Sequence, residues 1–181
     1  MKLALTVFVG LLLSLATFGQ APTEVTLELQ KKIKQDIEKE IPKLKQQLEK
    51  EKANPVGIEF TLDTFRVERF MQKYIDLDFS DFGMRDATFE TANLYDSLLN
   101  KYYKKLLSVL KGDDKKVLIQ AQKAWLVFRD SEIKLVGTIS KDEYSGGGTM
   151  QQLIDSAEYL DLIKSRTNAI FNHYVRATQS Y

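Results

Sequence analysis

Apolar side chains recur at helical spacing along almost the whole chain. Between residues 23 and 53 they follow one another at intervals of four, with a single interval of three, and they are Val25, Leu29, Ile33, Ile37, Ile41, Leu44 and Leu48. This spacing predicts one long helix with a narrow apolar stripe, whose other faces carry Lys and Glu. Because Pro42 lies inside the run, we expect a kink or a restart there. Residues 54–57, Asn-Pro-Val-Gly, are expected to end the helix.

This charged helical arm, residues 20–55, has two interpretations. It either lies across the main bundle or projects as a coiled-coil arm that pairs with a partner. One thin stripe is compatible with both, and we favour the first. The bundle domain itself is expected over residues 56–181.

Four further segments have helical periodicity. The first spans 62–75, with Thr61 or Asp63 as its cap, and the second spans 85–111 and ends at Gly112. The third begins at Asp113 or Asp114 and stops at Gly137; its inward residues are expected to be Leu118, Ala121, Trp125, Phe128 and Leu135. The last opens at Thr149, which has capping-box spacing with Gln152. Only residues 56–60 alternate as a strand would. The sequence therefore predicts an all-α, antiparallel bundle of about four to five helices.

The first 19 residues have the pattern of a secretory signal peptide. Lys2 is followed by an apolar run from Leu3 to Leu15 and by small residues around Thr17 and Gly19. We expect cleavage after Gly19, an exported protein that is periplasmic or secreted, and no integral membrane span afterwards. The alternative is an uncleaved N-terminal anchor.

Charge and cysteine content exclude several classes of function. The chain has 26 Lys and Arg against 25 Asp and Glu, so removal of Lys2 leaves 25 of each. A neutral chain argues against a nucleic-acid partner, which needs a basic surplus. The absence of cysteine excludes disulfides, thiolate catalysis, Cys-ligated zinc and a lipoprotein anchor.

The residues offer little for catalysis or metal binding. His173 is the only histidine, near the end of the last helix, where the helix dipole favours a cation. In the acidic connector 76–83, the first, third and fifth residues match an EF-hand loop, but Asp81 and Ala87 stand where glycine and glutamate are needed. We expect a solvated turn, with a weak divalent site as the alternative. We therefore predict no enzyme, no cofactor and no resident metal.

The segment from about Asp96 to Thr167 carries a series of motifs in a fixed order. An Asp, a Leu-Asn pair and a Tyr are followed by AQKAWLVFRDSE at residues 121–132, a glycine turn and an Arg-Thr pair. The marked positions are Asp96, Asn100, Tyr103, Trp125, Arg129, Asp130, Glu132 and Arg166. This order resembles the lysozyme inhibitor LprI-type domain family of the bacterial envelope, with a core at about 85–175. The chain departs from many members by having Ala87, Ile133 and Glu158 where they have cysteines.

The resemblance implies an exported envelope binding protein with a protein partner, a lysozyme. The other reading is a structural or adaptor protein that acts through its charged N-terminal helix. We expect the marked motif residues to hold the bundle together; a ligand-binding role would require them to face a cleft. Arg129 is expected to clamp a helix end or to pair with Asp96 or Glu132.

A glycine-rich loop is the stronger candidate for recognition, because a rigid scaffold would present it. We expect a flexible loop over residues 141–149. Its candidate binding residues are Asp142, Glu143, Tyr144, Ser145, Gly146, Gly147 and Gly148. A carboxylate and a tyrosine on such a loop are suited to entering the carbohydrate cleft of a lysozyme and meeting its basic rim. The alternative is that these are ordinary polar loop residues. The sequence does not indicate the oligomeric state.

Overall fold

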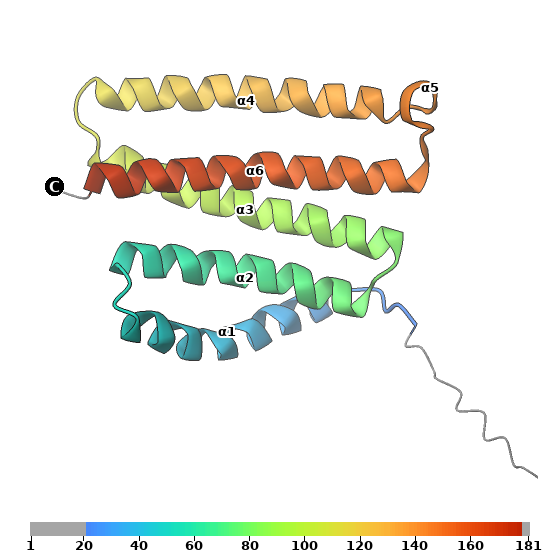
Figure 1. The fold of residues 1–181 in the computed structure, drawn as a ribbon, viewed down its shortest axis with the longest axis horizontal. Coiled ribbons are helices and arrows are strands. Elements are labelled where there is room, and N and C mark those ends of the chain that lie inside the picture. The colour runs from blue at the N-terminus through green and yellow to red at the C-terminus, as the bar shows by residue number, and fades with distance from the viewer. Residues whose placement is uncertain (1–20, 179–181) are drawn as a thin grey trace, which may run out of the picture.

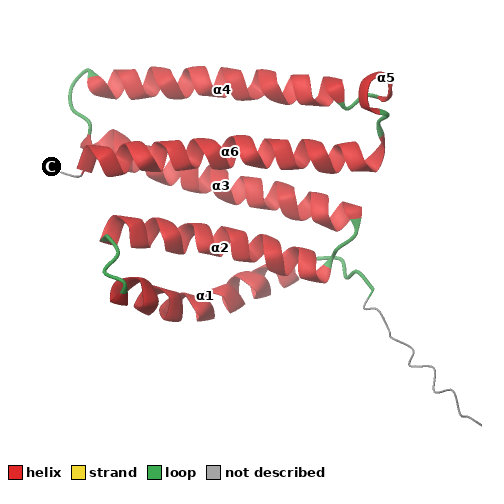
Figure 2. Cartoon of the chain, viewed as in Figure 1, coloured by secondary structure: helices red, strands yellow, loops and turns green. Residues whose placement is uncertain are grey.

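The computed structural model describes residues 21–178, which are helical apart from their connections (Figure 2). The helices are α1 (Leu27–Lys50), α2 (Pro55–Leu77), α3 (Asp81–Val109), α4 (Asp114–Ile139), α5 (Asp142–Ser145) and α6 (Gly148–Thr178). The predicted all-α bundle is confirmed, with six helices in this part of the chain instead of four to five. The additional one is α5, a single turn inside the predicted loop. The predicted signal peptide, residues 1–19, lies outside the described residues.

The helices lie side by side in an extended layer (Figure 1). The centre is formed by α2, α3 and α6, with α1 along the outer side of α2 and α4 along the outer side of α6. Val67, Tyr95 and Ile163 bring the three central helices together in one apolar cluster. The Thr167 hydroxyl on α6 also donates to the Tyr95 carbonyl on α3, at 3.2 Å. None of the helices within 21–178 has both the length and the apolar composition needed to cross a membrane.

The helix α1 packs on the layer through its apolar stripe. Ile33, Ile37 and Ile41 are all buried. Thr26 caps the helix, since its hydroxyl accepts from the Leu29 N–H at 3.3 Å. The helix does not restart at Pro42; it continues to Lys50 and bends along its length (Figure 1). The stripe predicted from the sequence is therefore a packing surface for α2.

The start of α2 differs from the prediction. Asn54 and Pro55, expected to end the preceding helix, begin the next one: the Asn54 side chain accepts from the Val56 N–H at 2.9 Å, and Pro55 occupies the first turn. Thr61 and Asp63 are therefore not caps, and residues 56–60 are helical. An Asn-Pro pair is compatible with either end of a helix. Proline lacks the N–H needed to continue a preceding helix, and its φ angle suits the first turn of a following helix that Asn caps.

The acidic connector is a capping turn. The Ser80 hydroxyl accepts from the Gly83 N–H at 3.0 Å and donates to the Asp78 carboxylate at 2.6 Å, so α3 begins at Asp81 and not at the predicted residue 85. A Cβ on Gly83 would lie 2.1 Å from Asp78 Cγ, so the turn requires glycine there. Asp76 accepts from the Gln72 amide at 2.8 Å. Across residues 21–178, no three His, Asp or Glu side chains are grouped so as to hold a metal ion.

The helix α4 buries less of its apolar surface than predicted. Leu118 is buried and Trp125 is half-buried, but Phe128 and Leu135 are 51% and 52% exposed, and Ala121 is exposed as well. Gly137 does not stop the helix, which continues to Ile139. The physical reason is its place at the edge of the layer, where α6 covers one side only (Figure 1).

Candidate functional site

The predicted binding loop is an ordered turn at the end of the layer where α4 passes into α6 (Figure 1). It consists of α5 followed by Gly146, Gly147 and Gly148, whose φ angles are 82°, 60° and 85°. Positive φ is sterically costly for any residue with a Cβ, so each of the three glycines has a conformational reason to be there. The loop was expected to be flexible; the structure shows a defined backbone path.

Contacts within the loop and with α6 hold this path. The Gly146 N–H donates to the Asp142 carbonyl at 3.2 Å, which closes α5. The Gln151 amide donates to the Ser145 carbonyl at 3.3 Å and ties the turn to α6. Gly147 lies against Asp142 so closely that a Cβ on Gly147 would be 1.7 Å from Asp142 Oδ1. The glycine therefore determines where the Asp142 carboxylate can lie.

The loop presents an aromatic ring next to two acidic side chains. Tyr144 is 62% exposed, and its neighbours Asp142 and Glu143 are exposed too. An exposed tyrosine is a common basis for protein recognition, because its ring supplies contact area, and neighbouring carboxylates favour a partner with basic side chains. Ser145 is half-buried and forms part of the base of the turn.

The first turn of α6 is joined to the first turns of α3. The Thr149 hydroxyl donates to Asp81 at 3.4 Å, and the Gln152 carbonyl oxygen accepts from Arg85. The predicted capping box between Thr149 and Gln152 is therefore wrong: both side chains are directed across to α3 and not back to their own helix. These contacts fix the start of α6, and with it the end of the loop, against α3.

The family-motif residues centre on Trp125, between α4 and α6. The guanidinium carbons of Arg129 and Arg166 lie 5.6 Å and 5.7 Å from the centre of its ring, within range of a cation–π interaction. The Arg166 Nε–H donates to the Gln122 side chain at 3.1 Å. Burial lowers the pKa of the Arg166 guanidinium below its ordinary value. The cluster thus joins the outer helix to the core through stacked, partly desolvated cations.

The other motif residues make local contacts. The Asn100 amide donates to the carbonyl and the carboxylate of Asp96, at 2.9 Å and 3.0 Å. Arg129 pairs with its neighbour Asp130 at 2.7 Å, and not with Asp96 or Glu132 as predicted. Arg129 also lines a hollow of about 330 Å³ between α4, α6 and Phe89 of α3. The motif residues are therefore divided between packing contacts and the surface, and Arg129 and Glu132 line hollows between α4 and α6.

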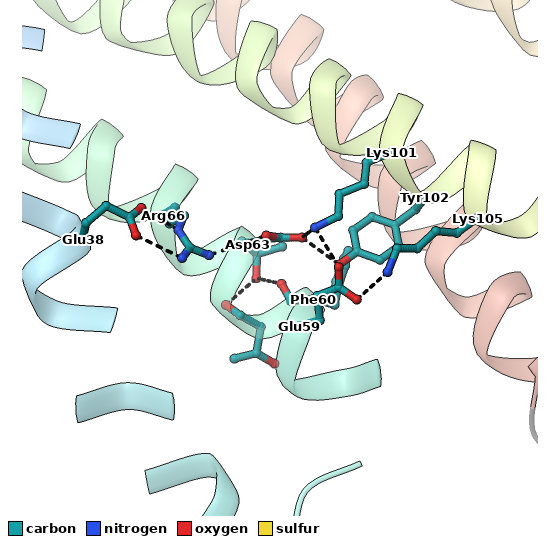
Figure 3. A network of polar contacts seen from close by, with 10 residues as sticks. Glu38, Glu59, Phe60, Asp63, Arg66, Lys101, Tyr102 and Lys105 are labelled. Atoms are coloured by element: carbon teal, nitrogen blue, oxygen red, sulfur yellow. Dashed lines mark hydrogen bonds and ion pairs between the residues drawn. The ribbon is translucent and has the colours of Figure 1, made fainter. Parts of the chain in front are cut away.

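The sequence analysis missed a polar network across α1, α2 and α3 (Figure 3). Arg66 donates to Glu38 at 2.6 Å and lies 3.6 Å from Asp63, so one guanidinium joins α1 to α2. Lys101 on α3 contacts the Asp63 and Glu59 carboxylates at 2.5 Å and 2.9 Å. These partners are far apart in sequence, so helical periodicity carries no signal of their contact.

The electrostatics of this network are those of a structural contact. Burial and the 2.8 Å hydrogen bond to Asp63 raise the pKa of the Tyr102 hydroxyl. Burial acts to raise the pKa of Glu59, but hydrogen bonds from Lys101 and Lys105 keep it below its ordinary value. The Glu59 carboxylate is therefore held ionised and paired, which is the opposite of a general acid or base poised near neutral pH.

Comparison with known proteins finds one family. A family model described as "Lysozyme inhibitor LprI" matches residues 79–170, which is 92 of the 181 residues. The match covers all of α3, α4 and α5, and α6 to Ile170, and so includes the Trp125 cluster and the glycine turn. No curated protein and no solved structure matches the chain.

Proposed function

The chain belongs to the lysozyme inhibitor LprI family, and on this premise we propose that it is an exported protein of the bacterial envelope that binds a lysozyme and inhibits it. The observation that carries the proposal is the match over residues 79–170, which contains the whole of α4, α5 and the glycine turn. The family description names an inhibitor and not an enzyme. We place the inhibitory contact at the loop from Asp142 to Gly148.

The chemistry of this loop suits the proposed target. A lysozyme cleaves a polysaccharide in a cleft with a pair of carboxyl groups. A tyrosine ring occupies the space of a sugar ring and packs on the same apolar surfaces. The Asp142 and Glu143 carboxylates, which precede Tyr144, would meet basic side chains at the rim of the cleft and increase the rate of association.

The backbone of the loop supports the same assignment. Because the hydrogen bonds from Gly146 to Asp142 and from Gln151 to Ser145 already hold the turn, binding requires little further ordering of the chain. By contrast, the apolar stripe of α1 is buried against α2. An adaptor role for the N-terminal helix would therefore have to use its charged outer face.

The first experiment is binding of the purified protein to c-type, g-type and bacterial lysozymes, with lysis of peptidoglycan followed in parallel. We expect binding that blocks lysis. Replacing an exposed aromatic contact at the centre of an interface weakens binding by about 30-fold or more, so Tyr144→Ala should show a loss of this size. The pair Asp142→Asn and Glu143→Gln should mainly slow association.

The chain offers a matched control for the acidic pair. Asp113 and Asp114 are also adjacent, exposed and located where two helices connect, but at the opposite end of α4 (Figure 1). Asp113→Asn with Asp114→Asn should leave binding unchanged. Absence of binding to every lysozyme would refute the proposed function. Binding that survives all the loop substitutions would keep the function and reject this loop as the contact.

Export is tested separately. Expression in a bacterial host followed by fractionation should give a periplasmic or secreted protein whose first residue is Gln20. An intact N-terminus in the membrane fraction would support an uncleaved anchor, and a cytoplasmic protein would contradict export.

A further inference from the structure

The outer side of α4 carries an exposed apolar seam. Its members are spaced by four, three, four, seven and four residues, and they are Val117, Ala121, Ala124, Phe128, Leu135 and Ile139. Residues three, four and seven apart lie on one face of a helix, so the six side chains form one row, which Ser131 and Glu132 interrupt between Phe128 and Leu135. Val117, Phe128 and Ile139 are 65%, 51% and 51% exposed. The row runs for about 33 Å, at about 1.5 Å per residue.

This spacing is the pattern of a helix that packs against another helix. An alternation of three and four is the apolar repeat of a coiled-coil contact, and a large exposed apolar patch bordered by polar residues is typical of an interaction site. The seam is separate from the surface that packs on α6, which uses Leu118 and Trp125. It is also separate from the α5 loop, and the proposed inhibitory contact does not use it.

Acidic side chains border the seam. Glu132 lies four residues after Phe128 and three before Leu135, which places it within the same face. On α6, Glu158 and Asp161 line the hollow of about 250 Å³ that Glu132 also lines, above an apolar floor of Val136 and Leu162. None of these three carboxylates forms an ion pair with another of residues 21–178, whereas most acidic side chains of α1 and α2 near other helices do.

We propose that the α4 seam and its acidic border bind a cationic amphipathic helix, a peptide or protein segment with an apolar stripe and flanking Lys or Arg. Phe128, Leu135 and Ile139 would pack on the apolar stripe of such a helix. Lys or Arg side chains beside that stripe would lay their methylene chains over Val136 and Leu162 and bring their charges to Glu132, Glu158 and Asp161.

Charge makes a second copy of this chain a poorer occupant. Figure 1 shows the first turn of α4 and the last turn of α6 at the same end of the layer. In an antiparallel pair of seams this end would face the three carboxylates of the other copy. It carries Lys115, Lys116 and Arg176 against Asp113 and Asp114, a net charge of only +1 to face three carboxylates, and Lys116 is already paired with Asp113 at 2.8 Å. In a parallel pair, the three carboxylates would face their own equivalents.

The test uses two synthetic helical peptides of about 20 residues, the length that covers the seam. Both carry leucine at the stripe positions; one has lysine at the flanking positions and the other has glutamate. We expect the lysine peptide to bind the purified protein, as followed by peptide fluorescence anisotropy, and to bind less tightly as salt is raised from about 0.05 to 0.5 M. The glutamate peptide should not bind.

Substitutions locate the contact. Phe128→Ser should weaken binding of the lysine peptide by about tenfold or more, as expected for a central apolar contact. Glu132→Gln combined with Glu158→Gln should weaken it by a similar factor and reduce its salt dependence. The matched controls are Val127→Ser, which is 68% exposed but off the seam, and Asp130→Asn, which is paired with Arg129; both should bind normally.

Three results would overturn the proposal. The first is equal binding, or equal lack of binding, of the two peptides. The second is unchanged binding by the Phe128 and the Glu132/Glu158 variants. The third is a dimer of the protein in sedimentation that Phe128→Ser converts to a monomer, which would assign the seam to a second copy. Thermal unfolding followed by circular dichroism confirms that each exposed substitution leaves the fold intact.

Discussion

The two edge helices of the layer, α1 and α4, solve the same packing problem differently. On α1 the apolar residues Ile33, Ile37 and Ile41 are 4%, 2% and 8% exposed, so nearly the whole stripe is used against α2. On α4 only Leu118 is buried to that degree, and a row of large apolar side chains remains outside. Ion pairs from Glu38 and Glu40 to α2 further close the α1 edge.

The two helices differ in the width of their apolar surface, although each has one neighbouring helix to cover it. The stripe of α1 is one residue wide per turn, which one neighbour covers. Apolar residues of α4 occupy a much wider arc, and α6 covers only part of it (Figure 1). An edge helix with one apolar face completes a fold, while an edge helix with two leaves a surface for a further contact.

The largest expected effect comes from comparing Ile37→Ala on α1 with Phe128→Ala on α4. Removing a buried isoleucine side chain costs about 2–5 kcal/mol, because apolar burial is lost and a cavity remains. Phe128 is half exposed, so its replacement should change the free energy of unfolding by about 0.5 kcal/mol or less. Urea denaturation of both variants measures the difference. Equal destabilisation would mean that the α4 seam is covered in the folded monomer.

Apolar faces that a neighbouring helix covers could be predicted from the sequence, and faces that remain uncovered could not. The apolar stripe of α1 is confirmed as buried at Ile33, Ile37 and Ile41, because it depends on helical periodicity alone. Phe128 and Leu135 were placed wrongly, because periodicity shows that a face is apolar but not whether a neighbour covers it. Helical periodicity does not indicate that α4 lies at the edge of the layer, where only α6 covers it.

The candidate site shows the same limit. The glycine turn was recognised from composition, but its order depends on backbone angles and on Asp142 lying against Gly147. The network of Figure 3 joins residues 28 to 46 positions apart, such as Glu38 with Arg66 and Glu59 with Lys105. Charged residues are frequent on every helix of this chain, so no local pattern singles out these partners.

The second prediction concerns the loop at the end of α4. Gly147→Ala places a Cβ at a φ of 60° and 1.7 Å from Asp142 Oδ1, so the Asp142 side chain must move. We expect a loss of about 1–2 kcal/mol from the backbone conformation. Lysozyme inhibition should weaken as well, because the carboxylate is displaced. Thermal unfolding and the lysis assay measure the two effects.

Two further variants separate the causes. In Gly146→Ala the φ of 82° is equally unfavourable, but no atom lies within 4 Å of the new Cβ, so only the conformational cost should appear. In an Asp142→Ala background, Gly147→Ala should cost no more than Gly146→Ala does. If Gly147→Ala is as damaging without the Asp142 carboxylate as with it, contact between these two residues does not determine the effect.

The smallest expected effect is the pH dependence of the α1 edge. Hydrogen bonds from Arg66 hold the pKa of Glu38 below its ordinary value of 4.5. A carboxyl group whose pKa is lowered by folding stabilises the folded state above its unfolded pKa, and this contribution is lost as the pH falls through the folded pKa. Both side chains are partly exposed, so the pair should contribute less than about 1 kcal/mol.

The substitution Glu38→Gln should therefore lower stability slightly at pH 7 and make the free energy of unfolding less dependent on pH between about 5 and 3. Urea denaturation across this range measures the slope. Glu49→Gln is the control on the same helix, because its partner Lys45 lies 3.8 Å away and belongs to α1 itself. If Glu38→Gln changes this slope more than Glu49→Gln does, the ion pair between Glu38 and Arg66 stabilises the packing of α1 on α2 in addition to the burial of Ile37. Equal slopes would leave apolar packing as the sole difference between the two edges.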